Sequence, residues 1–310
     1  METRRSDLTP DLFEPLAAGA RDSERIVGRP IGFWEDSWSR LKKNRAALLS
    51  LVLIVLLFVM AFFLGPLLSR YSPFAQDLSR GYAGPSGEFW FGTDHFGRDM
   101  WTRVWAGTRV SLYVALLAAL LDLFVGVPFG AVSGAVGGRI DGVMQRTIEI
   151  LNGIPNLVMA ILAMVVFQPG IVTISIAIGL IGWTDMARIV RGKMLQLRDQ
   201  EFALASRSLG AGRFRLVWKH LIPNSLGPII ISVMFTIPDA IFAESFLSFI
   251  GLGIQIPEAS LGSLISDGTK YLQFHPYLLW FPTAILCMIM ICFTLFGDGL
   301  RDALDPRMRK

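Results

Sequence analysis

Three long uncharged windows dominate the pattern of hydrophobic and polar positions along the chain. Residues 46–69, 150–184 and 271–297 contain no Asp, Glu, Lys or Arg. A helix of about 18 or more apolar residues is long enough to cross the roughly 30 Å hydrocarbon core of a bilayer. The pattern therefore predicts an all-α, polytopic membrane protein.

Six transmembrane helices account for these windows and for two further apolar runs. The middle window contains Gln168-Pro169-Gly170, which breaks a helix, so we expect a tight hairpin of two spans there. Gly65-Pro66 is expected to stop the first span, and Gly137-Gly138 the second. The predicted spans are 46–64, 110–136, 147–167, 171–187, 225–250 and 277–296.

Basic residues are distributed unequally between the two sides of this topology. The side that holds both termini carries 23 Lys and Arg residues and the other side carries 6. The positive-inside rule then predicts cytoplasmic termini. The expected order is a cytoplasmic tail (1–45), a first transmembrane helix (46–69), an extracytoplasmic segment (70–109), a core (110–297) that includes a cytoplasmic segment (188–224), and a cytoplasmic tail (298–310). The first 30 residues contain no apolar stretch typical of a cleavable signal peptide.

The composition of the chain is typical of a membrane protein and does not indicate a nucleic-acid-binding or disulfide-bonded protein. Hydrophobic residues make up 53% of the chain, charged residues 17%, and the mean hydropathy is +0.51. The net charge of +4 is explained by basic cytoplasmic loops, so no nucleic-acid partner is predicted. Cys287 and Cys292 are five residues apart within one apolar run, too far for a disulfide on a helix, and are expected to face lipid or the core.

The tail before the first span has a helical pattern of its own. Ile31, Trp34, Trp38 and Leu41 share one face, and basic residues follow at the membrane edge. This pattern is typical of an amphipathic helix in the headgroup layer. The alternative is an ordinary basic flank of the first span.

The segment 188–224 is too long for a simple turn between two spans. Asp199 is a candidate N-cap for a helix over 200–209, and Gly210 can end that helix with a positive φ. A second helix follows, which Pro223 is expected to end. Its predicted apolar face consists of Phe214, Val217, Trp218 and Leu221. Two short amphipathic helices that cannot easily reach lipid indicate a docking element for a cytoplasmic protein; the alternative is a hairpin that packs only on the chain's own spans.

This segment resembles the EAA motif of bacterial ABC importer permeases. The resemblance rests on Glu201-Phe202-Ala203-Leu204-Ala205-Ser206-Arg207-Ser208-Leu209-Gly210 and, after nine intervening residues, His220-Leu221-Ile222-Pro223-Asn224. Ser206 replaces the usual second Ala and His220 the usual Ile. By motif position, the resemblance implies that Glu201, Ala205, Ser206, Gly210, His220 and Pro223 couple the permease to an ATPase.

Four further stretches resemble the dipeptide/oligopeptide/nickel branch of that family, in particular its C-type permease. They are residues 91–99, 107–112, 248–253 and 297–307, and the whole resemblance covers about 35–307. It implies a five-helix type I ABC importer permease core in a bacterial plasma membrane. It also implies four kinds of partner: a second homologous permease, two cytoplasmic ATPase subunits, an extracytoplasmic solute-binding protein and a peptide substrate.

The chain lacks the residues that would let it hydrolyse ATP itself. Gly192-Lys193 is followed by Met194, and Ala187 stands where a P-loop needs its first Gly. We therefore expect no cofactor in this chain, with ATP and Mg bound by the partner subunits. An intramembrane enzyme is not favoured, since no nucleophile elbow or His-Glu-x-x-His sequence occurs.

Three acidic residues lie within the predicted spans, where a charge is expensive. Asp122, Asp239 and Glu244 are candidates for the translocation path, where they would attract the amino end of a peptide. The alternative for each is a buried acid that is hydrogen-bonded to a neighbouring span.

Two other patterns are better explained by structure than by ligand binding. Gly126, Gly130 and Gly134 repeat at four-residue spacing and predict a close helix–helix contact. Asp94, His95 and Asp99 are expected to form turns and cap the next helix, so no metal site is predicted.

Two alternatives to a peptide importer remain open. A nickel or other small-solute importer of the same family is compatible with these motifs. A stand-alone secondary transporter is less favoured, because the six spans contain no detectable repeat and the docking element would have no use.

Overall fold

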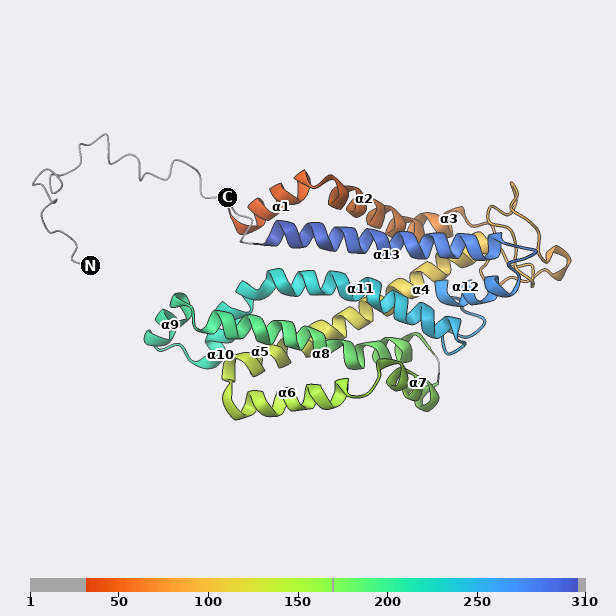
Figure 1. Ribbon diagram of the computed structural model, residues 1–310. Coiled ribbons are helices and arrows are strands. Elements are labelled where there is room, and N and C mark those ends of the chain that lie inside the picture. Colours follow the sequence, from red (N-terminus) through yellow and green to blue (C-terminus); the bar gives the residue numbers. More distant parts are fainter. Residues whose placement is uncertain (1–31, 169, 306–310) are drawn as a thin grey trace, which may run out of the picture.

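The computed structural model describes residues 32–168 and 170–305, and the predictions for the rest of both tails lie outside these residues. The described part is helical, with no strand and an isolated bridge between Thr93 and Asp99. The α-helices, shown in Figure 1, are α1 (Phe33–Lys43), α2 (Arg45–Val59), α3 (Gly65–Leu68), α4 (Met100–Leu121), α5 (Val127–Val136), α6 (Gly138–Asn152), α7 (Asn156–Phe167), α8 (Ile171–Arg198), α9 (Glu201–Ser208), α10 (Arg213–Leu216), α11 (Leu226–Phe249), α12 (Leu261–Lys270) and α13 (Tyr277–Leu304).

Short π and 3-10 turns join some of these helices into longer ones. The π turns are η3 (Met60–Leu64), η5 (Asp122–Gly126) and η6 (Val217–Leu221), and the 3-10 turns are η4 (Leu78–Arg80) and η7 (Pro223–Ser225). Five continuous helices in the described residues are long and apolar enough to cross a membrane. They are Arg45–Leu68, Met100–Val136, Ile171–Arg198, Pro223–Phe249 and Tyr277–Leu304.

The predicted third span, 147–167, is not a single helix. Its residues belong to α6 and α7, which bend by 77° at their junction and count as a sixth span only if taken together. Pro155 lies at this junction, and the residue before a proline disfavours the helical conformation. The predicted spans also leave residues 137–146 as a loop, and this is wrong, because α6 already begins at Gly138.

Several spans are longer than their uncharged windows. The first continues through Gly65-Pro66 to Leu68, because the π turn before Gly65 rearranges the hydrogen bonds and proline is tolerated early in a helical turn. The second begins at Met100 instead of residue 110, and the fourth extends eleven residues past Ala187 to Arg198. The last continues past residue 296 to Leu304, into the predicted tail. Charged residues at a helix end can therefore stand outside the apolar window without ending the helix.

The predicted glycine contact joins the second span to α8. A Cβ atom on Gly130 would lie 2.3 Å from the backbone oxygen of Ala187, and one on Gly126 would lie 2.6 Å from that of Trp183. Gly134 faces Met194 and Arg191 in the same way. The absence of side chains lets the two backbones approach closely, so this contact is internal to the chain.

The bundle has two clearly different ends (Figure 1). α9, α10, the start of α1 and the end of α13 lie at one end, on the left of the view. α7, α12 and the segment that leads from α3 into α4 lie at the other. The described ends of the chain thus share one side with the segment that resembles the EAA motif, as the even number of spans predicts.

The helix predicted before the first span is present as α1. Trp34 and Trp38 are exposed, while Leu41 is buried against Ala303 near the end of α13. Ile31, which was predicted to share their face, lies outside the described residues. Both cysteines are free; Cys287 is exposed and Cys292 is buried.

Candidate functional site

α9 is positioned by the end of α8. The prediction that Asp199 caps α9 is wrong: Asp199 ends α8, and the N-cap position of α9 is Gln200, whose side chain makes no cap hydrogen bond. Because the chain turns one residue later than expected, the Asp199 carboxylate instead lies 3.6 Å from Nε of Arg198.

Gly210 closes α9 in the conformation that its sequence predicts. Its φ is +84°, a left-handed value that side chains with a Cβ rarely adopt. The Gly210 N–H donates to the Arg207 carbonyl (2.9 Å) and the Ala211 N–H donates to the Ser206 carbonyl (3.0 Å). This pair of bonds is a Schellman motif, which requires a positive φ at the Gly210 position and turns the chain sharply toward α10.

The residues that match the EAA motif differ in exposure along α9. Glu201 and Ala205 are exposed, Ser206 is half-buried, and Ala203 between them is fully buried. Ala203 contacts the cluster of α5, α8 and η6 side chains beneath. One side of α9 is thus held by the bundle, and Glu201 and Ala205 lie on its free side.

Large apolar side chains are exposed around the turn between α9 and α10. Leu209 is 89% exposed, Phe214 78% and Trp218 51%. The predicted face of Phe214, Val217, Trp218 and Leu221 is therefore divided, because only Val217 and Leu221 point into the bundle. The Ile222 N–H donates to the Val217 carbonyl (2.9 Å), which makes this turn a π turn, and the α-helical spacing behind the prediction does not hold there.

His220 and Pro223 lie where this turn enters the next span. The His220 carbonyl accepts a hydrogen bond from Nδ2 of Asn224 (2.7 Å). The second helix of the segment ends at Leu221, just before Pro223, as predicted; Pro223 begins the 3-10 turn η7, which leads directly into α11. Proline fits this first position because its missing N–H has no partner to lose.

Glu244 is completely buried between α4, α11 and α12. Its carboxylate accepts hydrogen bonds from Oγ of Ser111 (2.8 Å) and of Ser248 (2.7 Å). Ser248 in turn is bonded to Ser260, which caps α12. Buried charges need such partners, so this arrangement favours the alternative of a structural acid that ties three helices together.

Asp122 and Asp239 have different surroundings. Asp122 is buried, and one of its oxygens accepts a hydrogen bond from Oγ1 of Thr236 on α11 (3.0 Å). Its other oxygen has no hydrogen-bond partner among the described residues. Asp239, one turn further along α11, is exposed on the surface of the chain. Of the three candidates, it is the one that is free to meet a solute or a second subunit.

Asp185 is a further acidic residue of this region that the sequence reasoning did not select. It lies on α8, near Asp122 and Asp239, with 79% of its side chain exposed and its carboxylate 3.8 Å from Nη1 of Arg188. It was missed because it falls at the predicted end of the fourth span, where a charge needs no explanation. α8 continues for thirteen more residues, so Asp185 belongs to the middle of a helix.

The acidic residues of the segment before α4 have structural partners. The Asp94 carboxylate accepts a hydrogen bond from Nε of the buried Arg98 (2.6 Å). Asp99 caps α4 by accepting a hydrogen bond from the Thr102 N–H (3.1 Å), as predicted. No group of three or more His, Cys, Asp or Glu side chains in the described ranges could hold a metal ion.

Two protein families match different parts of the chain. The family described as "Binding-protein-dependent transport system inner membrane component" matches residues 126–310. The family described as "N-terminal TM domain of oligopeptide transport permease C" matches residues 32–85.

Several relatives match nearly the whole chain. The oligopeptide transport system permease protein OppC of Bacillus subtilis is 46% identical, over 98% of this chain and 99% of its own length. The dipeptide transport system permease protein DppC of the same organism is 47% identical, over 94% and 91%. The OppC protein of Escherichia coli K12 is 43% identical, over 93% and 95%.

A solved structure has a similar arrangement of helices. A chain of the MetNI methionine ABC transporter in an inward-facing conformation has a TM-score of 0.55 over 66% of this chain and 97% of its own. At 17% identity this likeness shows a shared fold, and it confirms the predicted type I permease core. Taken with the two family matches and the full-length relatives, it means that the chain belongs to the family of binding-protein-dependent transport system inner membrane components.

Proposed function

We propose that this chain is a transmembrane permease subunit of an ATP-driven importer of oligopeptides or dipeptides. The observation that carries the proposal is the likeness over nearly the full length to OppC and DppC permeases, at 46–47% identity. The chain would form the translocation path together with a second homologous permease. An extracytoplasmic solute-binding protein would deliver the peptide.

The turn between α9 and α10 would dock on the ATPase subunits, which bind ATP and Mg. Its exposed apolar side chains, Leu209 above all, support this role, because a patch of this kind on a soluble face usually marks a protein contact. Ala205 would permit close approach and Gly210 would set the angle of the turn. Glu201, Ser206, His220 and Pro223 would complete the coupling segment.

The acidic residues would divide between the path and the scaffold. Asp239 would line the path, with Asp185 beside it, and would attract the cationic amino end of a peptide. Asp122, which is buried, would add to the negative charge of this part of the path. Glu244 would serve the path only indirectly, by holding α4, α11 and α12 together.

The proposed topology places the α9–α10 end of the bundle, with both termini, in the cytoplasm of a bacterium. The excess of Lys and Arg on that side supports it. The opposite end, with the segment between α3 and α4, would face the binding protein.

Uptake in the native host tests the proposed function. Deleting the gene is expected to abolish accumulation of a labelled dipeptide or tetrapeptide, and the wild-type gene should restore it. Methionine and nickel uptake, measured in the same strains, serve as controls. Normal peptide uptake together with loss of nickel uptake would favour the small-solute importer instead.

A further inference from the structure

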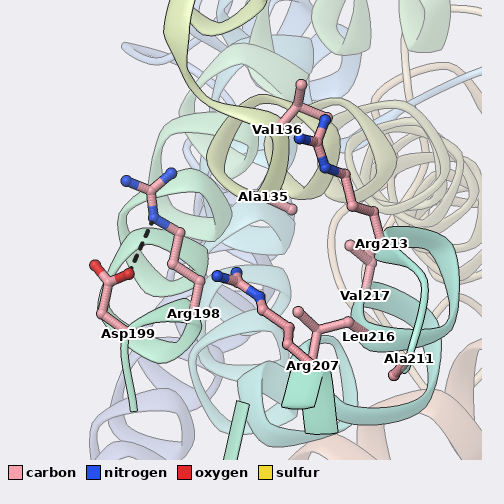
Figure 2. Close-up of a pocket in the computed structure, with 9 residues that line it drawn as sticks. All are labelled: Ala135, Val136, Arg198, Asp199, Arg207, Ala211, Arg213, Leu216 and Val217. Carbon is pink, nitrogen blue, oxygen red and sulfur yellow. Dashed lines mark ion pairs between the residues drawn. The ribbon is translucent and has the colours of Figure 1, made fainter. Parts of the chain in front are cut away.

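A cavity of about 420 Å³ opens between the α9–α10 turn and the ends of the spans above it (Figure 2). Its walls come from the last residues of α5, the end of α8, α9 and the start of α10. A volume of this size falls within the usual range of small-molecule sites. The cavity is distinct from the exposed side of the turn, where the ATPase contact is proposed.

Three arginines line this cavity: Arg198, Arg207 and Arg213 (Figure 2). Arg198 is held in place, since its Nη1 donates to the Gly134 carbonyl (3.1 Å) and its Nε lies 3.6 Å from Asp199. Arg207 and Arg213 make no ion pair within the described ranges. Three guanidinium groups with one carboxylate leave the cavity with a formal charge of +2, which favours the binding of an anion.

The chemistry of the walls selects the kind of anion. Guanidinium groups bind phosphate through paired, charge-assisted hydrogen bonds. Val136, Leu216 and Val217 form an apolar part of the wall that suits the glycerol and first acyl carbons of a lipid. A purely ionic ligand such as free phosphate would leave that apolar part uncovered.

The depth of the cavity also favours a lipid. It lies where α5 and α8 end, and both belong to membrane-crossing helices. In the proposed topology these helix ends lie on the cytoplasmic side, where basic pockets between transmembrane helices bind acidic headgroups.

We propose that this cavity binds the phosphate group of an anionic phospholipid from the leaflet at the α9–α10 end. The bound lipid bridges Arg198 at the end of α8 to Arg207 and Arg213 on the turn. It thereby holds the turn against the spans from which it projects. The proposal rests on the membrane topology and on this cavity, and it does not depend on which substrate is imported.

Binding of defined lipids to the purified full-length chain in detergent micelles tests this proposal. Fluorescent phosphatidylglycerol and phosphatidylcholine with the same acyl chains are titrated, and inorganic phosphate is added as a competitor. The test variant is Arg207→Gln with Arg213→Gln. The control is Arg215→Gln with Lys219→Gln, which removes two charges from the same segment at positions outside the cavity wall.

Phosphatidylglycerol is expected to bind the wild type more tightly than phosphatidylcholine, and the test variant should weaken that binding at least about tenfold. The control should retain it. Ala211→Phe, which fills the cavity and leaves the arginines intact, should weaken binding as the test variant does, and it keeps the test decisive if the arginine variant fails to fold.

Three results would overturn the proposal. One is equal binding of the two lipids by the wild type. Another is displacement of phosphatidylglycerol by inorganic phosphate at equal concentration, which would identify a free anion as the ligand. The third is a test variant that binds phosphatidylglycerol normally but no longer co-purifies with an ATPase, which would assign the arginines to a protein contact.

Discussion

Gly210 carries the sharpest residue-scale prediction. The φ of Gly210 is +84°, a left-handed conformation that costs an ordinary residue with a Cβ roughly 1–2 kcal/mol. A β-branched side chain at this position is strained by more than that. Gly210→Val is expected to reorient the turn, which leaves membrane insertion intact but reduces peptide uptake by tenfold or more. A tenfold reduction corresponds to about 1.4 kcal/mol. Uptake and membrane content are measured in the same cells.

Gly212 supplies the matched control for Gly210. It lies two residues away on the same turn, with a φ of −65° and open space at the position that a Cβ atom would take. Gly212→Ala should therefore transport normally. Equal loss of uptake in both variants would show that the turn tolerates no substitution at all, and unchanged uptake in Gly210→Val would remove the turn from the coupling mechanism.

Glu244 is expected to matter for stability and not for selectivity. Glu244→Leu leaves the hydroxyl groups of Ser111 and Ser248 without their buried acceptor, at a cost of about 1–3 kcal/mol for each. Glu244→Gln keeps an acceptor and should lose much less. Thermal unfolding in detergent measures the difference, and a changed substrate preference in a stable Glu244→Gln protein would contradict this role.

Local chemistry explains which residue predictions succeeded. Gly210 and the Asp99 cap depend on a few consecutive residues, so their conformations could be predicted from the sequence. Ser111, which bonds Glu244, and Thr236, which bonds Asp122, each lie more than one hundred residues away from their acid along the chain. Such partners are known only once the helices are packed.

At the scale of elements, the contact between α5 and α8 depends on the absence of side chains. Gly130→Ala places a methyl group 2.3 Å from the Ala187 carbonyl oxygen, which neither backbone can avoid without moving. Overpacking of this kind costs about 1–3 kcal/mol. The variant should melt several degrees below the wild type in detergent.

Gly142 on α6 is the control for the α5–α8 contact. Its Cβ position is open, so Gly142→Ala should be neutral or stabilise its helix by up to about 1 kcal/mol. Equal melting temperatures for the Gly130 and Gly142 variants would refute the close contact.

Helix ends and bends were the least predictable elements. The sequence predicts one span over 147–167, yet these residues are divided between the more polar α6 and the apolar α7. α6 is held by Asp141, whose carboxylate pairs with Arg191 of α8 at 2.6 Å and 2.7 Å. Hydropathy cannot foresee a long-range ion pair of this kind, and so it placed residues 137–146 in a loop.

At the scale of the whole molecule, the exposed acidic residues predict a charge preference of the path. Asp239→Asn removes a negative charge that water screens only partly, so uptake of peptides with a cationic amino end should fall about threefold to tenfold relative to N-acetylated peptides. Competition between the two peptide types measures this ratio. Asp302→Asn, an exposed residue near the end of α13, is the control and should leave the ratio unchanged.

The all-helical, membrane-spanning fold could be predicted because it depends on long apolar runs, whereas the orientation that the basic residues indicate stays a prediction. The apolar runs and the distribution of basic residues are both properties of the sequence that need no knowledge of packing. The exposure of Leu209 and the three-arginine cavity could not be predicted, since they depend on how α9 and α10 lie against α5 and α8.

The central proposal is that the α9–α10 turn is the contact through which a separate ATPase drives this permease. Replacing Leu209, which is 89% exposed, with a photo-crosslinking amino acid in living cells tests that contact directly. The expected product is a covalent adduct with a cytoplasmic ATPase, absent when the same amino acid replaces Leu78 at the opposite end of the bundle. An adduct only with lipid or with an extracytoplasmic protein would contradict it.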